Sequence, residues 1–149
     1  MKKPAKVLSV ILAVILAALS LASCGEGSST GAKLLKSSDK LVVIEAEATG
    51  GSLLDALNAL KEEGGLSFEG EDGDYGYYIT SVNGYTPDAS ANEYWAIYTT
   101  LGEYEGVSYS SAEYGTFDYE GTACASASYG VSGLIMVKGE TYVLTVESY

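Results

Sequence analysis

The first apolar segment after the N-terminal region changes from a strand-like to a helix-like pattern. Residues 41–44 form a continuous apolar run, which is followed by alternating small and acidic residues and then by a pair of glycines. This is typical of a strand that ends at a turn. Ser52 and Asp55 then form a capping-box pair, and leucines recur at helical spacing up to a second glycine pair. The pattern predicts a strand followed by one amphipathic helix over residues 53–63.

Beyond the helix, short apolar segments are punctuated by glycine, which is typical of strands joined by turns. The predicted strands cover residues 66–69, 76–82, 94–100, 116–119, 133–137 and 141–148. Asn83-Gly84 is a tight-turn signal, and the Ser/Ala/Gly-rich residues 123–132 are predicted to be a long loop. A helix as short as the predicted one is marginal alone and has to pack on a sheet. The sequence therefore predicts an α+β domain, with one helix on an antiparallel or mixed sheet.

The N-terminal 23 residues have the organisation of a bacterial export signal. Three lysines precede an apolar run over residues 7–22, which is somewhat shorter than the roughly 20 apolar residues of a spanning helix. A permanent N-terminal anchor helix is the alternative interpretation. Residues 21–24, Leu-Ala-Ser-Cys, resemble the lipobox of bacterial lipoproteins. The resemblance implies a lipid on Cys24 that anchors the chain to the extracytoplasmic face of the cell membrane.

These features divide the chain into three expected parts. Residues 1–23 are a lipoprotein signal peptide, and residues 24–38 are the lipidated Cys24 and a flexible tether rich in Gly and Ser. Residues 39–149 form one domain of ordinary size. Lipidation of Cys24 leaves Cys124 without a partner for an internal disulfide. Because small, uncharged residues surround Cys124 in the sequence, we expect a buried side chain rather than a reactive thiol.

Composition narrows the function classes. The chain has eight lysines, no arginine, no histidine and 20 acidic residues, with a formal charge of -12. Removal of the signal peptide leaves five lysines and a charge of -15. Such a chain would repel nucleic acid, and it lacks the histidines of most catalytic triads and many zinc sites. We therefore expect no catalytic residues, no required cofactor and a non-enzymatic role.

The acidic residues do not form a recognisable metal or catalytic motif. Residues 69–74 superficially suggest a calcium loop, but Asn83 stands where an EF-hand starting at Asp72 needs its glutamate. A solvated turn is the favoured interpretation, and no metal site is predicted. Carboxylate pairs such as Glu103 and Glu105 occur by chance in so acidic a chain, so they carry no evidence for a glycosidase. The 13 tyrosines, all between Tyr75 and Tyr149, are instead typical of an adaptable recognition surface.

Five segments of the domain resemble the C-terminal β-domain of transcobalamin and intrinsic factor, which bacterial and archaeal surface proteins also carry, usually catalogued as of unknown function. They are Gly-Ser-Leu-Leu-Asp-Ala-Leu at 51–57, Leu-Ser-Phe at 66–68, Tyr-Ile-Thr-Ser-Val-Asn-Gly at 78–84, Tyr-Trp at 94–95 and Gly-Val-Ser at 106–108. The resemblance implies a β-grasp-like fold and, as ligand, cobalamin or a related corrinoid. The large helical domain that grips the other face of cobalamin in the animal proteins has no counterpart in this chain.

The positions that match the family's binding strand and turn are the candidate site residues Trp95, Tyr94, Asn83, Gly84 and Tyr85. Trp95 has two interpretations: a core residue packed on the leucine stripe of the helix, or an aromatic group at the rim of a ligand site. We expect a membrane-anchored lipoprotein that binds a small ligand, cobalamin or another corrinoid, for uptake, with a transporter or other surface protein as partner. The alternative is a surface adhesion module that binds protein or glycan.

Overall fold

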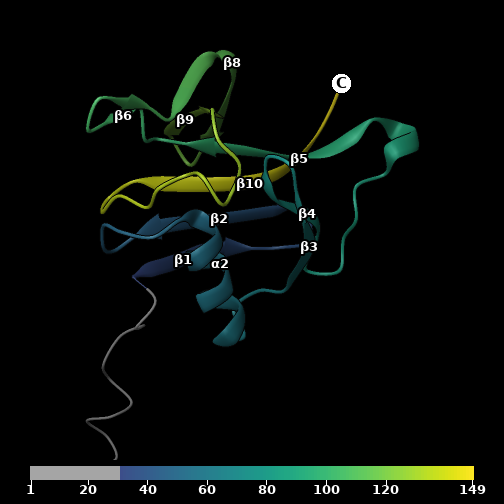
Figure 1. Ribbon diagram of the computed structural model, residues 1–149. Helices are drawn as coiled ribbons and strands as arrows, with labels where there is room; N and C mark the ends of the chain where they lie inside the picture. Colours follow the sequence, from purple (N-terminus) through teal and green to yellow (C-terminus); the bar gives the residue numbers. More distant parts are fainter. Residues whose placement is uncertain (1–30) are drawn as a thin grey trace, which may run out of the picture.

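The computed structural model describes residues 31–149, so the predicted signal peptide and Cys24 lie outside the described residues. Its elements, in chain order, are β1 (Ala32–Ser37), β2 (Leu41–Ala46), α2 (Leu53–Glu62), β3 (Phe68–Gly73), β4 (Gly76–Val82), the 3₁₀ turn η1 (Ala89–Ala91), β5 (Glu93–Thr99), β6 (Glu103–Tyr104), β7 (Val107–Ser108), β8 (Ser110–Tyr119), β9 (Thr122–Ala127) and β10 (Thr141–Ser148). Figure 1 shows a twisted main sheet with α2 against one of its faces.

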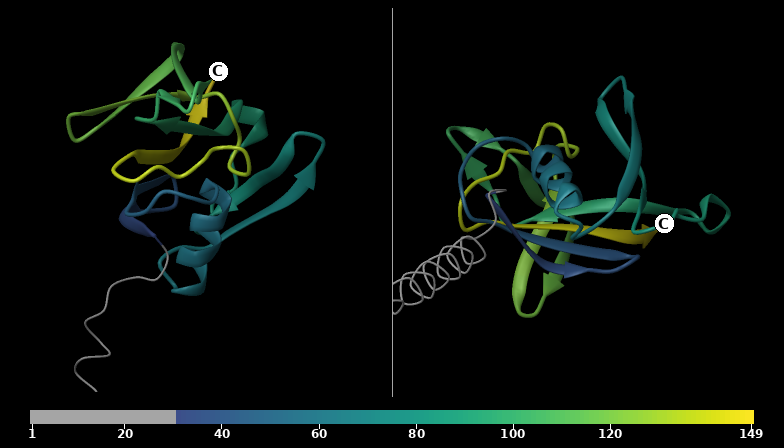
Figure 2. Two further views of the ribbon diagram at one scale, coloured as in Figure 1. Left: turned by 60° about the vertical axis from the view of Figure 1, so that its left-hand side comes forward. Right: turned by 90° about the horizontal axis from the view of Figure 1, so that it is seen from below.

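The main sheet has six strands in the order β1-β2-β10-β5-β9-β8, and every pairing in it is antiparallel. Strands β3 and β4 form a separate antiparallel hairpin, and β6 and β7 form a second, very short one. Seen from below in Figure 2, the β3–β4 hairpin and α2 lie on the same side of the main sheet. This side carries the larger core.

The predicted fold class, an α+β and β-grasp-like domain on an antiparallel or mixed sheet, is wrong. The described residues form a β-rich fold with ten strands, antiparallel sheets and one α-helix. Strand content was underestimated at both ends of the sheet. Residues 32–37, expected in the flexible tether, form β1, and the first half of the expected loop 123–132 belongs to β9. Their small and mixed side chains give little periodic signal, and pairing with the neighbouring strands β2 and β8 determines them.

The helix prediction is confirmed. Helix α2 begins after Ser52, whose side chain accepts a hydrogen bond from the Asp55 backbone N–H, while the Asp55 carboxylate accepts from the Ser52 N–H at 2.8 Å. Its buried stripe, Leu53, Ala56, Leu57 and Leu60, packs into one core with Ile44 of β2, Leu144 of β10 and Phe68 of β3. Strands β2, β4 and β10 also form where the sequence predicts them.

Residues 133–137, predicted as a strand, are an irregular segment that connects the sheet to the helix. The backbone N–H groups of Leu53 and Leu54 donate to the carbonyls of Leu134 and Val131, both at 2.8 Å. These bonds satisfy two of the amide groups that a helix N-terminus leaves without an intrahelical partner. Buried Tyr142 reinforces the segment, since its hydroxyl donates to the Ile135 carbonyl at 2.8 Å. These bonds hold residues 128–136, which we call the 128–136 loop, across the side of the sheet that α2 covers.

The opposite face of the sheet holds a smaller core around Val43, Tyr98, Cys124 and Val143. Cys124 is 1% exposed, which confirms the prediction of a buried side chain. Burial raises the pKa of its thiol, and Asp118 adds to the effect. A thiol that is buried and protonated at neutral pH is a poor nucleophile.

Most of the acidic run at residues 69–74 is strand, and only Asp74 lies in a turn. It forms most of β3 in the projecting hairpin. At Gly70 a Cβ atom would lie 2.3 Å from the Tyr78 carbonyl oxygen and 2.6 Å from the Tyr77 ring, so only glycine lets the two strands approach here. The hairpin is fixed to the 128–136 loop, because the Tyr77 N–H donates to Ser132 Oγ at 3.1 Å.

Candidate functional site

Two cavities meet between the β3–β4 hairpin and strand β5, and both are lined by Tyr78, Ile79 and Trp95. The first, of about 220 Å³, lies between the hairpin, the main sheet and the 128–136 loop. The second, of about 230 Å³, lies under the connection from β4 to β5. We call the two cavities together the aromatic groove, after its four rings, Tyr77, Tyr78, Tyr94 and Trp95. Ring-lined concavities of this kind are typical of ligand sites.

Trp95 lies at the junction of the two cavities. In the register of β5 with β10 it stands opposite Val146, and its half-buried indole packs against the core that α2 covers. Both interpretations of Trp95 from the sequence therefore apply, since the same ring contacts the core and lines the groove.

The indole N–H of Trp95 is the exceptional group of the groove. Its Nε1 atom is buried, and among residues 31–149 it is the one buried side-chain nitrogen or oxygen without a hydrogen-bond partner. A tryptophan N–H normally finds a partner when it is buried, and leaving a buried donor unsatisfied costs about 1–3 kcal/mol. Because its Nε1 atom is buried, this N–H is not accessible from the open space of the groove.

Tyr94 points to the other face of β5, as strand alternation requires. It is 39% exposed, its ring lies 5.8 Å from that of Tyr149, and it borders the second cavity. Tyr78 is 61% exposed and lines both cavities. The groove is therefore accessible from outside through its tyrosines.

Asn83 and Gly84 lie in the tight turn that the sequence predicts, and they do not line the groove. Asn83 has a φ of +48° and Gly84 a φ of +82°, the left-handed pair that a type I′ turn needs. The Asn83 side chain accepts from the Ser67 N–H at 2.9 Å and donates to Ser37 Oγ and the Ser38 carbonyl at 3.0 and 2.7 Å. Its amide group thus holds the β1–β2 turn and the start of β3 against this turn.

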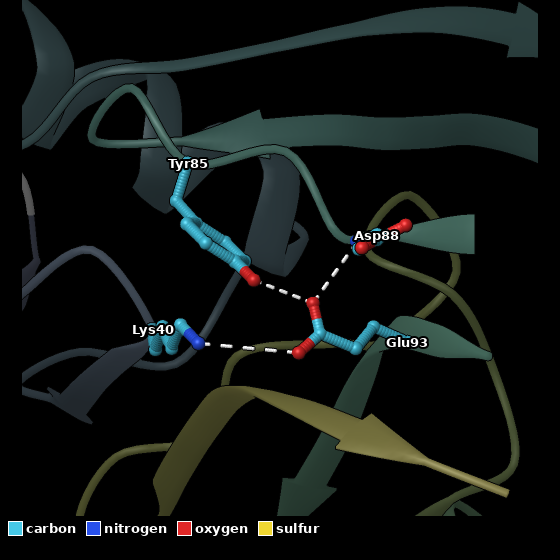
Figure 3. Close-up of polar contacts among 4 residues, drawn as sticks. All are labelled: Lys40, Tyr85, Asp88 and Glu93. Atoms are coloured by element: carbon cyan, nitrogen blue, oxygen red, sulfur yellow. Dashed lines mark hydrogen bonds and ion pairs between the residues drawn. The ribbon is translucent and has the colours of Figure 1, made fainter. Parts of the chain in front are cut away.

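Tyr85 belongs to a polar cluster on the surface, drawn in Figure 3. Its hydroxyl donates to Glu93 Oε2 at 2.5 Å, and the Asp88 N–H donates to the same oxygen at 2.9 Å. Lys40 lies 4.5 Å from the Tyr85 ring centroid, and its Nζ is 3.9 Å from Glu93 Oε1. The hydrogen bond from the Asp88 backbone, followed by that from Tyr85, lowers the pKa of Glu93. The cluster fixes the entry to β5.

The structure thus brings Trp95 and Tyr94 to the aromatic groove and leaves Asn83, Gly84 and Tyr85 beside it. It also adds Tyr77 and Tyr78 of β4, which the sequence shows only as members of a tyrosine-rich stretch, and the loop residues Gly130 and Val131. The loop carries no local signal for this role, because its contact with β4 joins segments about 50 residues apart in the sequence.

The groove has few charged groups beside it: Glu93, with Lys40 3.9 Å away, is the acidic residue among those that line it. No lysine lines either cavity in the described part of the chain, whereas Glu93 borders the second. Nor do residues 31–149 contain a group of three or more histidine, cysteine or acidic residues placed to hold a metal ion. No helix within this range combines the length and apolar character that crossing a membrane requires.

Comparison with protein families gives one match, to a domain of unknown function (DUF4430) over residues 50–99. The matched segment runs from the start of α2 through the hairpin to the end of β5. It therefore contains all four rings of the aromatic groove and the Asn83-Gly84 turn. Neither the curated proteins nor the solved structures yield a significant match.

Proposed function

We propose that this chain is a non-enzymatic, lipid-anchored protein of the bacterial cell surface that binds a small ligand in the aromatic groove. The observation that supports the proposal most directly is the aromatic groove itself, two neighbouring cavities that share Tyr78, Ile79 and Trp95 as lining residues. Concave surfaces lined mostly by apolar and aromatic side chains, with few polar groups, are typical of small-molecule sites.

The polar groups at the groove support a binding role over a catalytic one. Glu93 is the one acidic residue that lines either cavity, and its carboxylate already accepts from Tyr85 and Asp88. Its pKa is lowered, so it stays ionised at neutral pH, whereas a general acid or base works best with a pKa near the operating pH.

The location at the membrane is proposed on the lipobox-like residues 21–24. Because β1 begins at Ala32, seven residues separate it from Cys24. Even fully extended, they reach only about 25 Å. The domain would thus stand close to the lipid headgroups, and its acidic character would orient it away from an anionic surface.

A corrinoid is the first ligand to test, because the resemblance to the transcobalamin β-domain involves Trp95 and other residues of the groove. The two cavities, of about 220 and 230 Å³, are smaller than the roughly 300–1,000 Å³ of sites that enclose drug-sized ligands. A corrin ring would therefore lie across the mouth of the groove, on Tyr78 and Tyr94, with a peripheral amide group reaching Trp95.

The test is equilibrium dialysis of the full-length chain, in dodecyl maltoside micelles, against cobalamin and cobinamide. We expect retention of the corrinoid, weakened in a Tyr78→Leu variant and unchanged in Tyr114→Leu, which removes a tyrosine that is 81% exposed and outside the groove. Equal retention by both variants, or none by the unmodified chain, would contradict a corrinoid site in the groove.

A surface adhesion module for protein or glycan is the second candidate, and the projecting hairpin favours it. Tyr75, at the hairpin tip, is fully exposed, and it is followed closely in the chain by exposed Tyr78. On a glycan array, adhesion through the tip predicts that Tyr75→Ala abolishes binding while Trp95→Phe leaves it intact. The opposite pattern would place binding in the groove.

A further inference from the structure

The outer part of the β3–β4 hairpin, which projects from the main sheet in Figure 2, has no buried side chain. The register of the two strands shifts at the start of residues 70–78, and all of these residues are exposed or half-buried. At the base of the hairpin, by contrast, Phe68, Ile79 and Val82 are buried in the core under α2. Segments with little buried apolar surface open locally at low free energy. Residues 70–78, which we call the outer hairpin, can therefore move without unpacking that core.

A single hydrogen bond attaches the outer hairpin to elements outside the hairpin, among the residues that the structure describes. The Tyr77 N–H donates to Ser132 Oγ of the 128–136 loop at 3.1 Å. The approach is close, since a Cβ atom at Gly76 would lie 2.3 Å from the same oxygen. This bond is exposed, so water replaces it when it breaks and its net contribution is small. The bond to Ser132 can thus open and close at little cost.

The outer hairpin forms a wall of the aromatic groove. Tyr78 lines both cavities and Tyr77 lines the first. Each cavity, at about 220 and 230 Å³, is smaller than the roughly 300–1,000 Å³ that enclose a drug-sized ligand. Trp95 lines both as well, yet its Nε1 atom is buried. Displacement of the outer hairpin would widen both cavities at the wall that they share.

We propose that the outer hairpin is a lid over the aromatic groove, held closed by the bond from Tyr77 to Ser132. The lid turns about the base of the hairpin, where the register shifts. Opening it breaks that one bond to the loop and moves one half-buried ring, that of Tyr77, away from the core. The inference rests on the proposed function, because the groove is its ligand site. A corrinoid across the mouth of the groove would insert its peripheral group while the lid is open.

The Trp95 N–H provides a reporter of lid opening that needs no ligand. It has no hydrogen-bond partner in the described part of the chain, so burial alone protects it from hydrogen exchange. Because Trp95 is the only tryptophan, the ¹⁵N-labelled full-length chain in dodecyl maltoside gives one indole signal. The Val143 N–H, in a strand paired on both sides, reports global unfolding. We expect a lower protection factor for Trp95 than for Val143, and equal protection would overturn the lid.

A pair of serine variants in the 128–136 loop tests the bond that closes the lid. Ser132→Ala removes the acceptor of the Tyr77 N–H. We expect the Trp95 N–H to exchange about two- to threefold faster, which corresponds to the low end of the range for a hydrogen bond because this one is exposed. Ser128, which is exposed and bonded through its backbone alone within residues 31–149, provides the control. Equal exchange in Ser132→Ala and Ser128→Ala would overturn the proposal.

A disulfide locks the lid in a second test. A Cβ atom at Gly76 would lie 3.6 Å from the Ser132 Cβ, within the roughly 3.5–4.5 Å of a disulfide, so Gly76→Cys is combined with Ser132→Cys. Gly76 has a φ of +103°, which strains any other residue. The oxidised form is therefore compared with the reduced form of the same variant. We expect oxidation to slow exchange of the Trp95 N–H and to reduce the retention of cobinamide in equilibrium dialysis.

The outcomes separate the lid from the proposed function. Exchange of the Trp95 N–H that is unchanged by oxidation overturns the lid, and so does equal cobinamide retention by the oxidised and reduced forms. If the unmodified chain retains no corrinoid, the corrinoid site fails, and the exchange results still decide whether the lid exists. Circular dichroism checks the folding of each variant. Ser132→Ala, which adds no strain, keeps the lid falsifiable even if the double-cysteine variant does not fold.

Discussion

Replacement of Asn83 by alanine should destabilise the domain without directly affecting the aromatic groove. The change removes three side-chain hydrogen bonds, to the Ser67 N–H, Ser37 Oγ and the Ser38 carbonyl. Each such bond contributes about 0.5–1.5 kcal/mol net. It also places alanine at a φ of +48°, a left-handed conformation that costs about 1–2 kcal/mol. Because the site is partly exposed, we expect a total loss of about 2–4 kcal/mol.

Two further variants divide this loss into its causes. Asn83→Gly also loses the three bonds but tolerates the positive φ, so it should be about 1 kcal/mol more stable than Asn83→Ala. Asn58, which is exposed on α2, provides the matched control. Its replacement by alanine should change stability by less than about 0.7 kcal/mol, in the stabilising direction, because alanine is the better helix former.

The assay is urea unfolding followed by the fluorescence of Trp95, the only tryptophan. With an m-value of about 1–3 kcal/mol/M, a loss of this size lowers the midpoint by about 1–2 M. Ligand affinity of the folded Asn83 variants should match that of the unmodified chain. A loss of stability below about 0.5 kcal/mol, or a specific loss of affinity in stable protein, would refute the structural role assigned to the Asn83 side chain.

Two other changes test separate parts of the structure. Gly70→Ala should lower the melting temperature and detach the hairpin, because the added Cβ would lie 2.3 Å from the Tyr78 carbonyl oxygen; an unchanged hydrogen-exchange pattern in the hairpin would contradict this. Hydrogen bonds from Ser52 lower the pKa of Asp55 in the folded protein. The unmodified chain should therefore be more stable than Asp55→Asn above the ordinary pKa of about 4, and this advantage should disappear as the pH falls through the folded pKa. Urea unfolding at a series of pH values measures the difference.

The elements that the sequence predicts correctly are those whose signals are local. Helix α2 has a capping box, a leucine stripe and a glycine stop within about a dozen residues. Strands β2 and β10 are apolar enough to be recognised without their partners. The Asn83-Gly84 turn is encoded by two adjacent residues with positive φ. For these segments, local preference and the final packing agree.

The segments that were missed are strands because of their pairing, and their own side chains show no clear strand pattern. Strand β9 is built from small residues, and it is a strand because it pairs with β8 and with the end of β5. The charged strand β3 is held by its pairing with the tyrosine-rich β4. Likewise, the sequence shows an excess of tyrosine but not which rings meet, because the groove closes only when the 128–136 loop crosses the sheet and Ser132 binds the hairpin.

The difference between the expected and observed site has a common physical explanation. In a folded protein, a buried polar group without a partner is rare and calls for a reason. The Asn83 amide and the Tyr85 hydroxyl both have protein partners, so they position the turn and the entry to β5. The Trp95 N–H, two residues after Glu93, is buried without one. Strand β5 therefore carries two kinds of polar group: Glu93, whose bonds fix the strand, and the Trp95 N–H, which is buried without a partner in the described part of the chain.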